Sequence, residues 1–139
     1  MIYLVDSNVW LELLLEQERS EEVRQFLQAV QTDEFALTEF TLYSIGIITS
    51  RLNKNDVFAA FLSDILEGTG VKRISLSLTD LMELLSAMKE QDLDFDDAYQ
   101  YVAAKNNDLI LVSFDRDFDR TDLTRKTPAM VLAEIADCN

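Results

Sequence analysis

Short apolar runs alternate with segments of helical periodicity along almost the whole chain, and this alternation constrains the fold more than any other feature. The apolar runs cover residues 2–5, 34–37, 71–76 and 109–114. The helical segments cover residues 8–16, 20–30, 38–52, 55–65, 79–88 and 96–106, and Thr127-Pro128 starts a last short helix. Strands separated by helices are typical of parallel βαβ units. The sequence therefore predicts an α/β sandwich with a parallel sheet.

Little of the chain is available for linkers. It has 139 residues with only three glycines and one proline, and its apolar content of 48% is typical of a folded protein. We therefore expect a single domain over residues 1–139. No apolar run approaches the ~20 residues that span a bilayer, and the first residues lack the basic region of a signal peptide. We expect a cytoplasmic protein that has no membrane contact.

Composition also excludes classes of chemistry. The chain has no histidine and one cysteine, Cys138, so histidine-dependent nucleophiles and the usual zinc sites are excluded. The 12 basic and 26 acidic residues give a net charge of −14. This balance argues against a module that binds nucleic acid through basic contacts alone. It is compatible with an enzyme that meets phosphates through a bound metal, and it favours a basic protein partner.

Acidic residues stand where the expected strands and helices meet. Asp6 and Asp115 follow apolar runs, whereas Glu39 and Asp97 lie at helix starts. A parallel sheet gathers such positions at the edge formed by the carboxyl ends of its strands. Carboxylates gathered there repel one another unless a cation joins them. The pattern therefore predicts a divalent-metal site, with metal-assisted phosphodiester hydrolysis as the leading function.

These residues resemble the motifs of a known family, the PIN domain, and within it the single-domain VapC-type toxin ribonucleases. The motifs are LVDSNVW with Asp6, Ser7 and Asn8, LTEF with Glu39, DDAYQYVAA with Asp97, and LVSFDRDF with Ser113, Asp115 and Asp117. They occur in the family's order and at its length, and Thr127-Pro128 is similar to the family's C-terminal pattern. The resemblance implies a three-layer α/β/α sandwich with a central parallel sheet of Rossmann-like type.

The resemblance also implies an activity. Such proteins bind Mg²⁺ or Mn²⁺ and cleave RNA, as toxin components of type II toxin–antitoxin pairs. Asp6 and Asp97 would be the principal metal ligands, and Asp115 a further ligand, directly or through water. Glu39 would orient or deprotonate the attacking water, or hold a second metal. Hydrogen-bonding residues around the metal would be Ser7, Asn8 and Ser113, and Asp117 would share or replace part of the role of Asp115.

The resemblance further implies a homodimer and a small antitoxin with a basic segment. Other interpretations remain open from the residues themselves. Asp6 can be a helix cap, and Glu39 an ordinary first-turn glutamate stabilised by the helix dipole. The whole protein can be a non-catalytic interaction domain whose acidic pocket receives a basic side chain. A phosphotransfer domain of the haloacid-dehalogenase kind needs a second aspartate two residues after its nucleophile, and position 8 is Asn8.

Overall fold

A parallel sheet forms the centre of the computed structural model, which describes residues 1–67 and 70–138. Its strands are β1 (Tyr3–Val5), β2 (Phe35–Thr38), β3 (Lys72–Ile74) and β4 (Ile110–Val112). They are hydrogen-bonded in the order β3-β2-β1-β4, and every pairing is parallel. The expected parallel sheet is confirmed. The first and last strands of the sequence, β1 and β4, thereby become neighbours.

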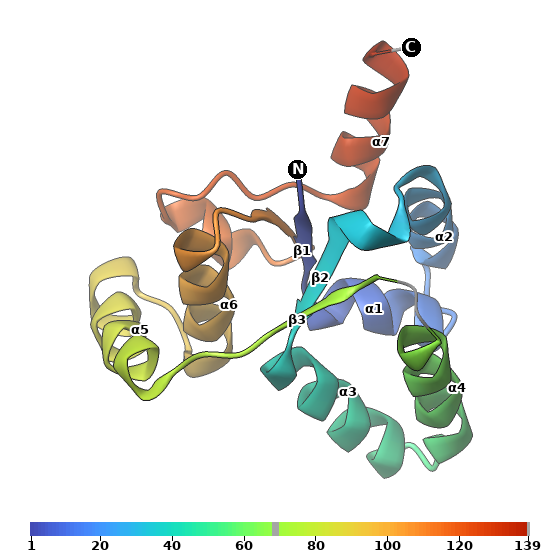
Figure 1. Ribbon diagram of the computed structural model, residues 1–139, viewed down its shortest axis with the longest axis horizontal. Coiled ribbons are helices and arrows are strands. Elements are labelled where there is room, and N and C mark those ends of the chain that lie inside the picture. Colours follow the sequence, from blue (N-terminus) through green and yellow to red (C-terminus); the bar gives the residue numbers. More distant parts are fainter. Residues whose placement is uncertain (68–69, 139) are drawn as a thin grey trace.

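Helices follow the strands and cover both faces of the sheet. They are α1 (Ser7–Leu14), α2 (Ser20–Ala29), α3 (Glu39–Arg51), α4 (Asn55–Leu66), α5 (Leu78–Gln91), α6 (Phe95–Asn106) and α7 (Pro128–Asp137). Short 3₁₀ turns, η1 (Thr32–Glu34) and η2 (Arg116–Arg120), complete the described chain. Figure 1 shows α5 and α6 on one side of the strands, and α1, α2 and α4 on the other. This arrangement is the expected three-layer α/β/α sandwich.

Successive side chains along each strand point to opposite faces of the sheet, and this produces two cores, one on each face. In β1, Tyr3 and Val5 point into the first core, and Leu4 between them points into the second. The first core packs against α1, α2, α4 and α7, and the second packs against α5 and α6. Because β1 is buried on both faces, it reads as a continuous apolar run instead of an alternating one.

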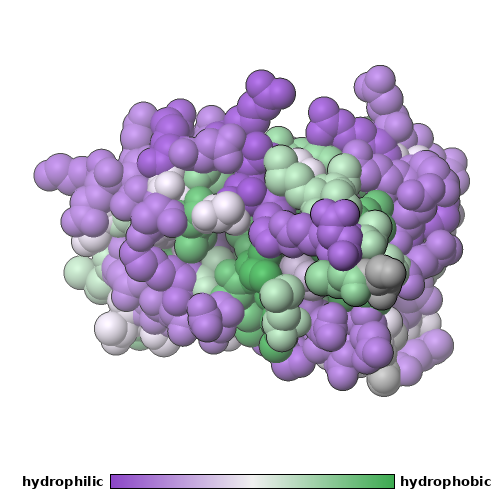
Figure 2. All heavy atoms as spheres, turned by 90° about the horizontal axis from the view of Figure 1, so that it is seen from above, coloured by the Kyte–Doolittle hydropathy of each residue, from purple (hydrophilic) through white to green (hydrophobic). Residues whose placement is uncertain are grey.

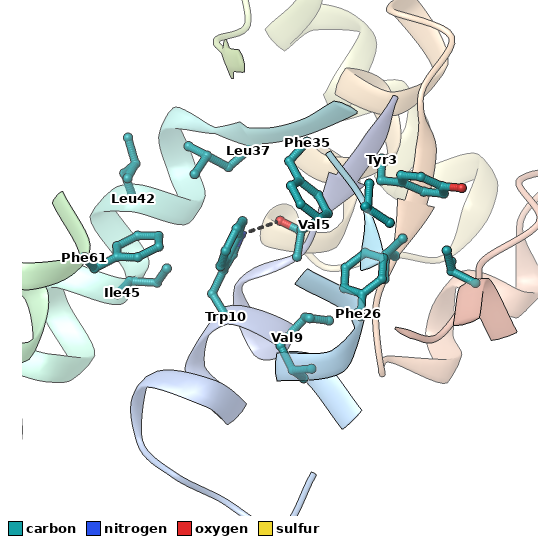
Figure 3. Packing of buried hydrophobic residues seen from close by; sticks show 14 residues of the cluster. Tyr3, Val5, Val9, Trp10, Phe26, Phe35, Leu37, Leu42, Ile45 and Phe61 are labelled. Atoms are coloured by element: carbon teal, nitrogen blue, oxygen red, sulfur yellow. Dashed lines mark hydrogen bonds between the residues drawn. The ribbon is translucent and has the colours of Figure 1, made fainter. Parts of the chain in front are cut away.

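Aromatic side chains fill the first core (Figure 3). Phe26 lies edge-on to Phe35, with their ring centroids 5.3 Å apart. Trp10 packs against Phe61 at 5.3 Å, and its indole N–H donates to the Val5 carbonyl at 3.1 Å. That bond satisfies the polar atom of a buried indole and ties α1 to the end of β1. The start of α1 is thereby held in place directly beside the end of the strand.

Side-chain caps fix where several helices begin. The Thr38 hydroxyl accepts from the Thr41 backbone N–H at 3.0 Å and caps α3, as the sequence predicts. Thr127 caps α7 in the same way, and Pro128 occupies its first turn. No helix among the described residues is both long and apolar enough to cross a membrane. On the face shown in Figure 2, hydrophobic atoms gather in the middle between hydrophilic flanks.

Candidate functional site

Three of the four expected acidic residues converge where β1 and β4 end. Asp6 directly follows β1, and its backbone N–H donates to the Val112 carbonyl at the end of β4 at 3.0 Å. Asp115 follows β4, and Asp97 lies in the first turn of α6, which packs on β4. All three line one hollow of about 270 Å³ together with Asp96. The parallel pairing of β1 with β4 therefore joins residues about a hundred positions apart in sequence.

The Asp6 carboxylate is buried and surrounded by donors. Its side chain is 5% exposed. Oδ1 accepts from the Ser7 backbone N–H at 2.8 Å and from the Gln100 amide at 2.9 Å. Oδ2 accepts from the Ser113 hydroxyl at 2.7 Å and, more weakly, from the Asn8 amide at 3.4 Å. Burial raises the pKa of Asp6, whereas the bonds from Gln100, Ser113 and Ser7 oppose that rise.

Gln100 connects Asp6 to a buried polar group at the start of α3. Its amide nitrogen donates to Asp6 and also to the Thr41 hydroxyl at 2.8 Å. Its carbonyl oxygen accepts from the Thr38 hydroxyl at 2.8 Å. All four side chains are buried, and no buried side-chain polar atom in the described residues lacks a partner. A fully satisfied network of this kind holds Asp6 in one rotamer.

Asn8 and Ser113 connect Asp6 to the loop that carries Asp115. The Asn8 amide donates to the Ser113 hydroxyl at 3.2 Å, and its carbonyl oxygen accepts from the Phe114 N–H at 3.2 Å. The same Ser113 hydroxyl accepts from the Asp115 backbone N–H at 3.0 Å. The hydrogen bonds of Asn8 and Ser113 lie beside the acidic cluster, and their expected role around a bound metal stays a prediction. Ser7 lines the hollow and donates to Asp6 through its backbone.

The compact part of the cluster consists of Asp97, Asp115 and Asp117. A carboxylate oxygen from each lies within 4.8 Å of the others, and Asp97 forms a second set of this kind with Asp94 and Asp96. Asp97 is 8% exposed, and its pKa is raised to about 8 by burial first and then by repulsion from Asp115 and Asp96. Asp117 donates its backbone N–H to Asp115 at 2.9 Å, which holds the two carboxylates near one another. Such a set offers the oxygen ligands that a hard divalent cation takes, and Asp117 also lies 3.5 Å from the Arg120 guanidinium.

Glu39 lies outside this set. Its carboxylate accepts from the Arg73 guanidinium at 2.6 Å and from the Tyr43 hydroxyl at 3.1 Å. Arg73 belongs to β3, beside the strand that leads into α3, and is held there by its register with Leu37. The residues of α3 that line the acidic hollow are Phe40, Ser44 and Ile48, and Ser44 is the polar one among them. Ser44 is five positions after Glu39 and therefore about 140° further around the helix.

Sequence reasoning did not find the neutral side chains of the site. Gln100, Thr41 and Ser44 each surround or line the hollow, and none of them carries charge. Gln100 had one usable signal, because it stands three residues after Asp97 and so lies on the same face of a helix. The role of Thr41 depends on contacts between α3 and α6, which a single sequence does not reveal.

Comparisons with known proteins identify similar chains. The family model of the PIN domain matches residues 3–123, whereas a comparison with curated proteins found no match. VapC20, a sarcin-ricin loop-cleaving toxin from Mycobacterium tuberculosis, is 16% identical at a TM-score of 0.75, covering 88% of this chain and 96% of that one. VapBC2 from Rickettsia felis, bound to promoter DNA, is 17% identical at a TM-score of 0.73, and the match covers 91% of this chain and 98% of that one. FitAcB from Neisseria gonorrhoeae is 17% identical at a TM-score of 0.69, and the match covers 92% of this chain and 99% of that one.

Proposed function

Because this chain belongs to the PIN domain family, we propose that it is a Mg²⁺- or Mn²⁺-dependent endoribonuclease and the toxin component of a type II toxin–antitoxin pair. One observation carries the proposal: Asp97, Asp115 and Asp117 bring carboxylate oxygens within 4.8 Å of one another. Asp97 and Asp115 of this cluster line a hollow of about 270 Å³ together with the buried Asp6. The proposed reaction is hydrolysis of an RNA phosphodiester.

The residues of the hollow fit a hard divalent cation. Every charged group in it is a carboxylate, and the chain has no histidine that would favour a softer metal. Burial, followed by repulsion from Asp115 and Asp96, raises the pKa of Asp97, and a cation at the cluster would relieve the repulsion. When bound, Mg²⁺ or Mn²⁺ supplies a water of lowered pKa and offsets negative charge on the phosphate. The latter effect matters for a protein whose net charge is −14.

The proposed ligands are Asp6, Asp97 and Asp115, and the surroundings of their carboxylates differ. Asp97 and Asp115 have oxygens directed into the cluster with Asp117. Asp6 has four donors around its two oxygens, so the 3.4 Å contact from Asn8 is the one that would give way on metal binding. Ser113 would hold Asp6 and the backbone of Asp115 in fixed relation during the reaction. Glu39, which pairs with Arg73, is not included in this ligand set.

We also propose an antitoxin partner with a basic segment, and a homodimer. Both were expected from the resemblance, and a chain of similar fold belongs to a toxin–antitoxin complex from Klebsiella pneumoniae. The acidic hollow and the net charge of −14 attract a basic side chain. The same attraction supports the alternative function, a non-catalytic domain that only binds a basic partner. The cytoplasmic location expected from the sequence remains a prediction.

Cleavage of a mixed RNA pool with Mg²⁺ or Mn²⁺ separates these two functions. We expect cleavage by the protein and none by the variant with Asp6→Asn and Asp97→Asn together, because both carboxylates line the hollow. The matched control is Asp64→Asn, an exposed aspartate on α4, and it should cleave as the unaltered protein does. Cleavage that survives the double substitution would refute the assignment of the site. Absence of cleavage in the unaltered protein would favour the binding function.

A further inference from the structure

The two oxygens of the Asp6 carboxylate differ in how fully donors occupy them. Oδ1 accepts from the Ser7 backbone N–H at 2.8 Å and from the Gln100 amide at 2.9 Å. Oδ2 accepts one short bond, from the Ser113 hydroxyl at 2.7 Å, and the long contact of 3.4 Å from Asn8. A carboxylate oxygen has about two lone-pair sites. Oδ1 is therefore filled, whereas Oδ2 keeps one site that a cation can take.

The Gln100 amide is held in one orientation, because its two ends have different partners. The nitrogen donates to Asp6 and to the Thr41 hydroxyl at 2.8 Å, and the carbonyl oxygen accepts from the Thr38 hydroxyl at 2.8 Å. A flipped amide would place its carbonyl oxygen against the Asp6 carboxylate, two acceptors with no proton between them. All four side chains are buried. The donor on Asp6 Oδ1 is therefore fixed by three contacts at once.

The second donor on Oδ1 belongs to the backbone. Ser7 is the first residue of α1, and Asp6 is the N-cap of that helix. The bond of 3.1 Å from the Trp10 indole to the Val5 carbonyl holds the helix against the end of β1. A cation that used both oxygens of Asp6 would have to displace one of the two donors from Oδ1. The donor to be displaced is Gln100, since the Ser7 N–H can move only with the helix.

Divalent cations differ in what they require of a carboxylate. Ca²⁺ takes about six to eight oxygen ligands in a flexible geometry and often uses both oxygens of a carboxylate. Mg²⁺ requires a near-octahedral arrangement, keeps several waters and binds through one or two carboxylates. Asp115, which lines the same hollow as Asp6, also has one oxygen engaged, by the Asp117 backbone N–H at 2.9 Å. A site whose carboxylates each offer few open positions suits Mg²⁺ and is poor in ligands for Ca²⁺.

We propose, on the basis of the metal-dependent function proposed above, that Gln100 selects Mg²⁺ and Mn²⁺ against Ca²⁺ by filling Asp6 Oδ1, so that Asp6 offers the cation one oxygen. Gln100 is a positioning residue in this role, because it acts through Asp6. A neutral amide suits the task. A lysine or arginine in its place would also fill Oδ1, but its charge would repel the cation at close range.

The test compares cation selectivity in the absence of RNA. Gln100→Ala removes the donor, and Gln100→Leu removes it while it retains the volume of the buried side chain, in case the alanine variant does not fold. The control is Thr41→Val, which breaks the bond between Gln100 and Thr41 in the same network and leaves the donor on Asp6 in place. Free Mn²⁺ is measured by electron paramagnetic resonance while Mg²⁺ or Ca²⁺ displaces the bound Mn²⁺. The measured quantity is the ratio of the Kd for Ca²⁺ to the Kd for Mg²⁺.

We expect a ratio of at least about ten in the unaltered protein, and a fall of about tenfold in each Gln100 variant, because Ca²⁺ then gains the second oxygen of Asp6. Thr41→Val should keep the ratio within about twofold, although it weakens the same network. An unchanged ratio in the Gln100 variants, or an equal fall in Thr41→Val, would overturn the role of Gln100 and leave the metal site and the proposed function intact. Absence of Mn²⁺ binding in the unaltered protein would refute the proposed function, and the selectivity with it.

Discussion

Replacing Gln100 by leucine should destabilise the protein strongly, although leucine has a similar volume and is itself suited to a buried position. The substitution removes the 2.9 Å bond to Asp6, the 2.8 Å bond to Thr41 and the 2.8 Å bond from Thr38. The two threonines can compensate each other, because their hydroxyl oxygens are 3.1 Å apart. Asp6 Oδ1 then keeps only the Ser7 backbone donor.

The magnitude follows from the cost of a buried polar group that loses its partner. That cost is about 1–3 kcal/mol for a neutral group and more for a charged one. With Asp6 carrying most of the loss, we expect the free energy of unfolding to fall by about 2–4 kcal/mol. The pKa of Asp6 should also rise further, since the Gln100 bond now lowers it. Protonation of Asp6 will then offset part of the fall in the free energy of unfolding.

Urea unfolding at neutral pH measures this difference directly. The control is Gln28→Leu, on the exposed side of α2, which should change the free energy of unfolding by less than about 0.5 kcal/mol. A loss below about 1 kcal/mol in Gln100→Leu, within the range of an ordinary surface change, would refute the account of Gln100 as the support of Asp6.

Further predictions concern pH, Glu39 and the core. Because the pKa of Asp97 is raised to about 8, the folded protein keeps a proton that the unfolded chain loses near its ordinary value, so the metal-free protein should lose stability as pH rises from about 4 to about 8. Urea midpoints at both ends of that range will show it, and a midpoint independent of pH would contradict it. Mn²⁺ affinity should rise over the same range, because the proton must leave before the carboxylate binds a cation. Glu39→Gln should leave Mn²⁺ affinity within about twofold. It should lower the free energy of unfolding by less than about 1 kcal/mol, since the ion pair between Glu39 and Arg73 is exposed. A loss of metal binding, measured by calorimetry, would return Glu39 to the site. Phe26→Ala should lower the free energy of unfolding by about 3–5 kcal/mol, because Phe26 is completely buried among aromatic rings.

Much of the fold is readable from the sequence because burial on both faces leaves a direct trace. Strands such as β1 and β4 appear as unbroken apolar runs, and Thr38 marks the start of α3. The order β3-β2-β1-β4 leaves no such trace. It depends on which helix crosses which face, and that is decided by packing between segments far apart in sequence.

The site was readable to the extent that it depends on strand ends. Asp6 and Asp115 were located because both follow apolar runs that became neighbouring strands. Glu39 was expected at the site from its position at a helix start. Its carboxylate pairs with Arg73, whereas Phe40, Ser44 and Ile48 of α3 line the hollow. Gln100 was missed because an uncharged residue in a helix looks like ordinary surface until its neighbours are known.

Divalent-cation binding tests the central claim most directly, namely that the converging aspartates form a metal site. Calorimetric titration with Mn²⁺ should show saturable binding to the protein at pH 8. Asp97→Asn and Asp115→Asn should each weaken that binding at least tenfold, because each removes a carboxylate of the compact cluster. The exposed control Asp64→Asn should bind as the unaltered protein does. Equal affinity in all four proteins, or no saturable binding at all, would contradict the account.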